Sequence, residues 1–270
     1  MSVSTRTGRG LRAGVAALTA AGALTTGALA ASALATADEP APLPFAAGER
    51  LTFRISYLRL TAGRATLTVE PGAAEAPHSL RFSAEARSEG FFAWLMRFRV
   101  DDRTLATWDT ASGCSLAIEK HLREGRAQRD QSVAFEGTQA RVVDPKVPQG
   151  TFGVEPCSLD VLSALYVTRL RGVPETGRLE LPAFDNGKRY VLGVRLLRRE
   201  RLDLPPPLGR GVPTLVVEPQ LVEGTGLFVS EGRLTLWLTD DARRIPVRLR
   251  AKVPIGSVAA DLESVAGALP

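Results

Sequence analysis

Residues 80–87 read LRFSAEAR, a stretch in which apolar side chains alternate one by one with polar ones. This period of two is typical of a β-strand with one buried and one solvated face. The same alternation recurs in both directions along the chain, at residues 51–57, 65–69, 98–108, 115–122, 131–135, 140–143, 178–181, 188–197, 214–218, 233–238, 245–252 and 257–262. The pattern therefore predicts a chain built largely from short strands.

Short connections rich in turn-forming residues separate many of these runs. They include Pro71-Gly72, Glu124-Gly125, Asp185-Asn186-Gly187 and Glu231-Gly232. Tight turns join antiparallel neighbours, and a sheet with this many strands must close or curve to protect its edges. We therefore expect a mostly β protein whose antiparallel meander forms a barrel or a strongly curved sheet.

One segment departs from the period of two. Residues 158–171 (SLDVLSALYVTRLR) place apolar side chains at helical spacing. Ser158 is suited to the N-cap position, Asp160 would lie in the first turn, and Gly172 follows the last periodic residue. The sequence thus predicts one substantial helix, at about 158–171, packed against the sheet.

The N-terminal segment has the organisation of a secretory signal peptide. Arg6, Arg9 and Arg12 precede an uncharged run, residues 13–37, that ends in small residues suited to cleavage. We expect residues 1–37 to be a cleaved signal peptide, 38–44 a Pro-rich linker and 45–265 a single β-barrel-like domain. The protein would then be periplasmic, with no stable membrane span after cleavage. An uncleaved anchor is the alternative, because the uncharged run is long enough to cross a bilayer.

Composition limits the class of partner. The formal charge is +5, but three of the 34 Lys and Arg residues precede the first acidic residue, Asp38. The remaining charges are nearly balanced, whereas nucleic-acid binding needs a clustered basic surface. The sequence also lacks a phosphate-binding loop, a dinucleotide fingerprint and a Gly-x-Ser-x-Gly elbow. We expect neither a nucleic-acid partner nor a cofactor.

Two cysteines, Cys114 and Cys157, occur in a chain expected to reach an oxidising compartment. They predict a disulfide, with two free buried thiols as the alternative. His78 and His121 lack the close paired spacing of zinc ligands, so no metal site is expected.

Three carboxylates could serve a glycosidase-type reaction, which needs two suitably spaced acids. They are Asp160, Asp240 and Asp241. Neighbouring residues on a strand point to opposite faces, so Asp240 and Asp241 cannot flank one bond without a bend. Their position in the run DDARR, between two strong strands, is typical of a turn whose aspartates cap backbone amides.

A short apolar run does not alternate and is therefore not an exposed strand. It contains Phe91, Phe92, Trp94, Leu95 and Met96. The run either plugs one end of the sheet as core or forms an apolar mouth that contacts a lipid-like ligand. In the second case Tyr166, on the predicted helix, would join these five residues as a ligand contact.

Several segments, taken in order, carry a resemblance. They are Pro44-Phe45-x-x-Gly48-Glu49-x-Leu51-x-Phe53, Ala62-Gly63, Asp160-x-Leu162-Ser163-Ala164-Leu165-Tyr166-x-x-Arg169, Leu236-Trp237-Leu238-x-Asp240-Asp241-x-Arg243-x-Ile245-Pro246-Val247 and Gly256-Ser257. Over residues 44–262 the chain resembles the DUF3108 family of exported bacterial proteins. The resemblance implies a β-barrel-like envelope protein and supplies no catalytic residues. The two cysteines are not part of the shared pattern.

Three functions remain open at this point. The first is a non-enzymatic periplasmic binding or carrier protein for a lipid-like or other apolar envelope ligand. The second is a scaffold that binds an envelope protein. The third is a polysaccharide hydrolase that uses the Asp carboxylates. A continuous apolar cavity would favour the carrier, and a cleft with close carboxylates would favour the hydrolase.

Overall fold

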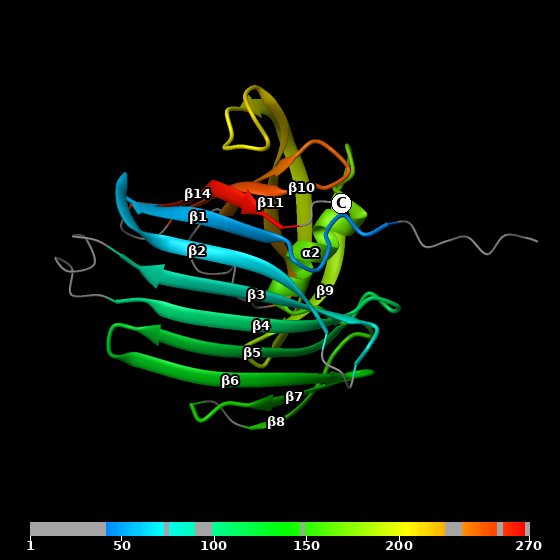
Figure 1. The fold of residues 1–270 in the computed structure, drawn as a ribbon. Helices are drawn as coiled ribbons and strands as arrows, with labels where there is room; N and C mark the ends of the chain where they lie inside the picture. Colours follow the sequence, from blue (N-terminus) through cyan, green and yellow to red (C-terminus); the bar gives the residue numbers. More distant parts are fainter. Residues whose placement is uncertain are drawn as a thin grey trace, which may run out of the picture. The chain divides into compact units, whose positions relative to one another are not determined.

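A computed structural model describes residues 42–72, 76–89, 99–146, 149–224, 234–252 and 256–267. Among these residues, 14 strands pair into one antiparallel sheet, against which a single helix, α2, packs (Figure 1). The predicted fold class, an antiparallel meander with one helix, is therefore confirmed. Within the described pairings the sheet runs from β8 to β9 without joining these two edges, so it is an open sheet rather than a closed barrel.

Thirteen of the described strands overlap the alternating runs of the sequence, and β8 was not predicted. The elements are β1 (Arg50–Tyr57), β2 (Leu60–Pro71), β3 (Ser79–Ser88), β4 (Asp101–Asp109), β5 (Ser115–Glu124), β6 (Ala127–Glu136), β7 (Gln139–Val143), β8 (Gly150–Gly153), α2 (Val161–Arg171), β9 (Leu179–Asp185), β10 (Lys188–Leu202), β11 (Val212–Gly224), β12 (Leu234–Thr239), β13 (Pro246–Lys252) and β14 (Ser257–Ala266).

The strand order reveals two meanders joined at a central seam. Neighbours run β8-β7-β6-β5-β4-β3-β2-β1-β14-β13-β12-β11-β10-β9. The seam is the antiparallel pairing of β1 with β14, which places Arg50 opposite Ala266 and Tyr57 opposite Val258. The first and last strands therefore lie in the middle of the sheet, while β8 and β9, which flank α2 in the sequence, form its edges.

The sheet curves enough for strands of the two meanders to face each other. The ring of Phe135 on β6 lies 6.2 Å from that of Phe184 on β9, centroid to centroid. Nearby, the buried Lys120 of β5 forms an ion pair with Asp185 at the end of β9. This curvature creates an inner face, and α2 packs against it.

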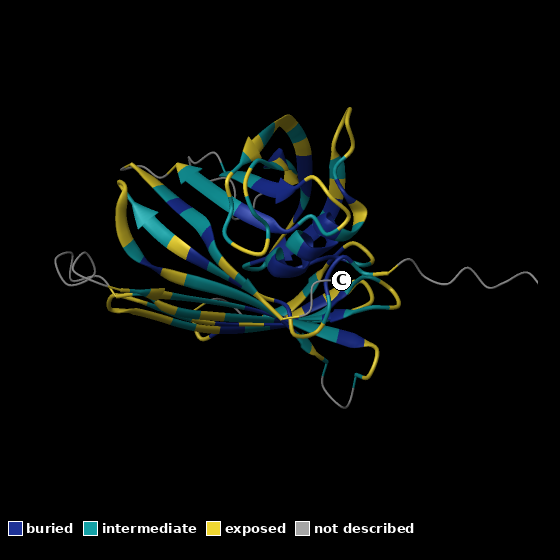
Figure 2. Cartoon of the chain, turned by 45° about the horizontal axis from the view of Figure 1, so that its top comes forward, coloured by how far each residue is buried: buried dark blue, intermediate teal, exposed yellow. Residues whose placement is uncertain are grey.

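The inner face carries the larger apolar cluster, which gathers around α2 (Figure 2). It includes Phe82 and Trp108 from the first meander, Leu181 and Val217 from the second, and Tyr166 from the helix. Each of these side chains is at most 1% exposed, so α2 is buried by both halves of the sheet.

A second apolar cluster lies on the opposite face of the strands next to the seam. Val216 and Trp237 belong to it, whereas their neighbours Val217 and Leu238 belong to the inner cluster, as the period of two requires. The β10–β11 connection covers this cluster with Leu204 and Leu208. The Pro-rich stretch 205–207 thus belongs to a loop between two strands.

The helix begins two residues later than expected. Its N-cap is Asp160, whose carboxylate accepts the amides of Leu162 and Ser163, so the prediction of Ser158 as the cap is wrong. The reason is that Leu159 is held in extended conformation by hydrogen bonds with Pro182 and Phe184 of β9. The helix therefore cannot start before Asp160, and it ends at Gly172 as predicted.

The described part of the chain contains no helix with the length and hydropathy needed to cross a bilayer. The predicted signal peptide, residues 1–37, lies outside the described residues.

Candidate functional site

An apolar pocket lies between α2 and the inner face of the sheet. Its volume is about 260 Å³, and its walls are almost entirely hydrocarbon. The lining comes from seven elements and consists of Ala84, Thr104, Val161, Leu162, Ala164, Leu165, Thr168, Leu192, Val194, Val217, Pro219, Leu234, Leu236 and Leu249. Both meanders thus contribute walls, and the helix contributes one side.

Side-chain size along β3 and β4 explains where the space arises. On β3, Phe82 and Ala84 point to the same face, and on β4 Trp108 and Thr104 do so as well. Phe82 and Trp108 fill the interior, with ring centroids 5.8 Å apart. Ala84 and Thr104 are direct neighbours across the two strands and are too small to reach α2, so a cavity remains beside them.

The helix adds an apolar face to this cavity. Val161, Leu165 and Thr168 recur at spacings of four and three residues and therefore lie on one side of α2. The Thr168 hydroxyl donates a hydrogen bond of 2.7 Å to the carbonyl of Ala164, so its polar atom is already satisfied within the helix. A ligand in the pocket would meet hydrocarbon along this wall.

Two buried polar side chains, Lys120 and Tyr190, lie on strands that adjoin or form the pocket's walls, outside its lining. Thr104 is paired in register with Lys120, whose ammonium group is bound to Asp185. On the other meander Tyr190 lies two residues from Leu192, on the same face of β10. The Tyr190 hydroxyl is buried and has no hydrogen-bond partner among the described residues. Burial raises the pKa of this hydroxyl, which therefore remains a donor at neutral pH.

The C-terminal end of α2 is fixed by a buried ion pair. Arg169 donates to both carboxylate oxygens of Glu49, at 2.6 and 2.8 Å, and neither side chain is exposed. Its remaining donors reach the carbonyls of Pro44 and Arg243, at 3.0 and 3.2 Å. Its guanidinium also lies 5.2 Å from the ring centroid of Phe45. Three segments quoted for the sequence resemblance therefore meet at this residue.

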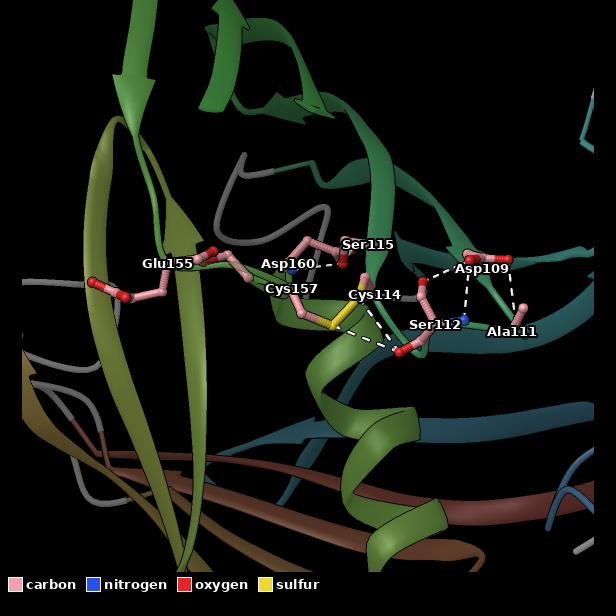
Figure 3. The surroundings of a disulfide bond; sticks show 9 residues. Asp109, Ala111, Ser112, Cys114, Ser115, Glu155, Cys157 and Asp160 are labelled. Atoms are coloured by element: carbon pink, nitrogen blue, oxygen red, sulfur yellow. Dashed lines mark hydrogen bonds between the residues drawn. A yellow bond between two sulfur atoms is a disulfide. The ribbon is translucent and has the colours of Figure 1, made fainter. Parts of the chain in front are cut away.

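The N-terminal end of α2 is fixed by a carboxylate and a covalent bond (Figure 3). Asp160 is 1% exposed and accepts hydrogen bonds of 2.6 Å from the hydroxyls of Ser115 and Ser163, in addition to its two amide bonds. Cys114 and Cys157, which precede Ser115 and Asp160, form a disulfide with Cα atoms 4.7 Å apart. The predicted disulfide is confirmed.

The candidate carboxylates do not come together. Asp160 caps the first turn of α2, whereas Asp241 lies in the β12–β13 turn, which contacts the last turn of the helix through Arg244 and the Arg169 carbonyl. An 11-residue helix is about 16 Å long, well beyond the separation of about 5–10 Å that glycosidase pairs require.

Asp240 and Asp241 each have a structural partner. Asp240 accepts a hydrogen bond of 2.8 Å from Arg199, and Asp241 accepts the hydroxyl of Thr239 at 2.7 Å and the amides of Arg243 and Arg244 at 3.1 Å. The turn interpretation drawn from the DDARR run therefore agrees with these contacts.

Of the six ligand contacts predicted from the sequence, Tyr166 alone is among the described residues. Phe91, Phe92, Trp94, Leu95 and Met96 are outside the described residues. Tyr166 is 1% exposed and stacks on Phe82, with ring centroids 3.8 Å apart. It belongs to the aromatic core next to the pocket and is not one of the lining residues.

Sequence reasoning missed the lining itself, because its members are ordinary core residues scattered over seven elements. One signal was present: Ala84 and Thr104 are small residues at inward positions of strands that carry Phe82 and Trp108 two or four residues away. Small side chains beside large ones on the same face indicate a void only once the register of β3 and β4 shows that the small ones are neighbours.

Comparison with solved structures supports the fold. The chain is similar to a β-barrel-like protein of the domain of unknown function DUF1849 from Brucella abortus, with a TM-score of 0.55 and 11% identity over 82% of this chain and 98% of that one. The hypothetical protein CT021 from Chlamydia trachomatis aligns with a TM-score of 0.36 and 8% identity over 83% and 89% of the two chains. The first of these likenesses, at 11% identity, speaks to the fold alone.

Comparison at the level of sequence gives the family. No curated protein matches the chain. Residues 52–263, which span β1 to β14, match the family described as "Protein of unknown function (DUF3108)". The chain belongs to the DUF3108 family.

Proposed function

We propose that the protein is a periplasmic binding protein that holds a lipid-like apolar chain in the pocket between α2 and the inner face of the sheet. The observation that carries the proposal is the pocket's lining, which is hydrocarbon except for two threonines. Well-formed apolar pockets are few in a protein, and they bind apolar molecules.

The size of the pocket narrows the ligand. A volume of about 260 Å³ lies just below the range of roughly 300–1,000 Å³ typical of small-molecule sites. A single slender chain, such as part of an acyl or isoprenoid tail, suits this space better than a bulky ring system.

The compartment also supports the proposal. The Cys114–Cys157 disulfide is typical of proteins in oxidising compartments, where a carrier would move an apolar molecule through an aqueous space. The N-terminal sequence adds the features of a signal peptide.

Native mass spectrometry of protein purified from the periplasmic fraction, followed by solvent extraction and lipid analysis, tests the proposal. We expect a stoichiometric adduct that is extractable as a lipid. Ala84→Phe places a ring in the pocket and should lower the bound fraction by about tenfold or more, equivalent to about 1.4 kcal/mol.

Ala117→Phe is the matched control, because Ala117 lies on β5 next to the inward Ile118 and points to the opposite face. It should retain the adduct. An apo mass for the wild type, unchanged after incubation with envelope lipids, would overturn the proposal and favour a scaffold. Equal loss in both variants would show that the adduct does not occupy this pocket.

A further inference from the structure

The β1–β2 hairpin ends in an unusual turn. Tyr57 pairs with Leu60, so the loop consists of only two residues, Leu58 and Arg59. Both have positive φ, 49° and 71°, as a type I′ turn requires. Such turns strongly favour Asn-Gly or a similar pair, because other L-residues are strained at positive φ. A leucine and an arginine here are therefore unfavourable for folding.

The side chains at this tip are also unfavourable in water. Leu58 is 53% exposed and Leu60 is 57% exposed, the two largest values among the exposed large apolar residues of the described chain. The Leu58 side chain lies over Gly256 of the β13–β14 connection. A Cβ atom on residue 256 would lie 2.4 Å from the Cδ2 atom of Leu58, so glycine at this position leaves room for the leucine. The tip thus combines backbone strain with exposed apolar surface, a combination that indicates a function outside folding.

Two cations accompany the leucines. Arg59 lies in the turn itself, and Lys252 ends the neighbouring strand β13, opposite Ser257. The amide of Leu58 donates to the carbonyl of Ser257 at 3.3 Å, which places the two hairpins side by side. Both cations are exposed, and neither has an acidic partner among the described residues. The tip therefore offers apolar groups flanked by free positive charge.

We propose that the β1–β2 tip docks the protein on a bilayer surface rich in anionic lipid. Leu58 and Leu60 would enter the boundary between headgroups and acyl chains, and Arg59 and Lys252 would remain with the lipid phosphates. This arrangement explains why the turn carries residues that cost stability. The inference rests on the hairpin alone and is independent of any ligand in the pocket beside α2.

Co-sedimentation of protein purified from the periplasmic fraction with vesicles tests the inference. Vesicles of phosphatidylglycerol and phosphatidylethanolamine should bind the protein, and vesicles of phosphatidylcholine should bind it about tenfold more weakly. The double substitution Leu58→Asn/Arg59→Gly installs the favoured turn. It should raise the Tm by about 2 °C or more while lowering binding to the anionic vesicles by about tenfold or more.

Leu197→Asn, at a leucine that is 38% exposed on β10, is the matched control and should bind as the wild type does. Opposite effects of the turn substitution on stability and on binding separate docking from misfolding. Undiminished vesicle binding by the turn variant would overturn the inference. Absence of binding by the wild type would do the same and would favour a protein as the partner of the tip.

Discussion

At its N-terminal end α2 is held by one buried carboxylate, surrounded by neutral donors, and by a disulfide to the β4–β5 connection. At its C-terminal end it is held by a buried ion pair between Arg169 and Glu49, which are 120 positions apart in the sequence. The first end is tied to the β4–β5 connection and to Ser115 of β5, and Leu159, just before the cap, is hydrogen-bonded to β9. The second end joins the chain ahead of β1 to the β12–β13 turn through Pro44 and Arg243.

The difference shows how α2 can line a pocket whose walls come from both meanders. The N-terminal anchor fixes the helix to the first meander, beside the bonds of Leu159 to β9 of the second meander. The C-terminal anchor fixes it to the chain ahead of β1 and to the β12–β13 turn. Because a buried charge without its partner is far more costly than a lost neutral hydrogen bond, the C-terminal anchor should be the more sensitive.

Replacement of Arg169 is expected to have the largest effect on stability. Arg169→Met leaves the Glu49 carboxylate buried without a partner and should lower the free energy of unfolding by about 3–5 kcal/mol. Urea denaturation measures this loss. Arg171→Met, at an exposed arginine of the same helix turn, should change stability by about 0.5 kcal/mol or less.

The double substitution Glu49→Leu/Arg169→Met distinguishes an unpaired charge from a packing defect. Replacing both members of a buried pair with apolar residues is often nearly neutral, so this variant should regain a large part of the lost stability. If it were as unstable as Arg169→Met, the carbonyl bonds and ring contacts of Arg169, rather than its charge, would fix the helix end.

Loss of the disulfide is expected to have a smaller effect. Cys114→Ser/Cys157→Ser releases a constraint between residues separated by 43 positions and should cost about 2–4 kcal/mol. Wild-type protein in a reductant should show the same loss of stability, and the variant should not respond to the reductant. A loss of stability larger than that of Arg169→Met would show that the N-terminal end of α2 is the more sensitive of the two.

The smallest effect on stability is expected from Asp241, in the β12–β13 turn that contacts the C-terminal end of α2. Burial alone would raise the pKa of Asp241, but hydrogen bonds from Thr239 and Arg243 outweigh it and lower the pKa. The ionised carboxylate therefore stabilises the fold above the ordinary Asp value of about 4, and this contribution is lost as the pH falls through the lowered pKa.

Asp241→Asn should therefore cost about 1 kcal/mol or less at pH 7, because the side chain is over one third exposed and solvent screens it. Denaturation curves of both proteins at pH 7 and below pH 4 measure the difference, which should shrink in acid. A constant difference across this range would mean that the amide and hydroxyl contacts, and not the charge, order the turn.

The sequence alone revealed the fold class because the period of two persists through nearly every strand, and the helix because its spacing differs. The exact start of the helix did not follow, since a tertiary contact of Leu159 with β9 decides between Ser158 and Asp160. The disulfide could be predicted from the compartment and the count of cysteines.

The anchors and the pocket could not be predicted. Glu49 and Arg169 look like ordinary surface charges in sequence, and only the sheet curvature brings them together inside the protein. The pocket depends on Ala84 and Thr104 being adjacent, which is a matter of strand register. The lining residues come from seven elements and are neighbours only in space, so no contiguous stretch of sequence marks them.

Because β1 pairs with β14, the order of strands in the sheet differs from their order in the sequence. The ends of the domain's sequence form the middle of the sheet, and the middle of the sequence forms its edges. Shortening the C-terminus by one strand would therefore not trim a border but divide the sheet into two separate meanders. A ribosome must release nearly the whole domain before these two meanders can join, so the seam between them forms late.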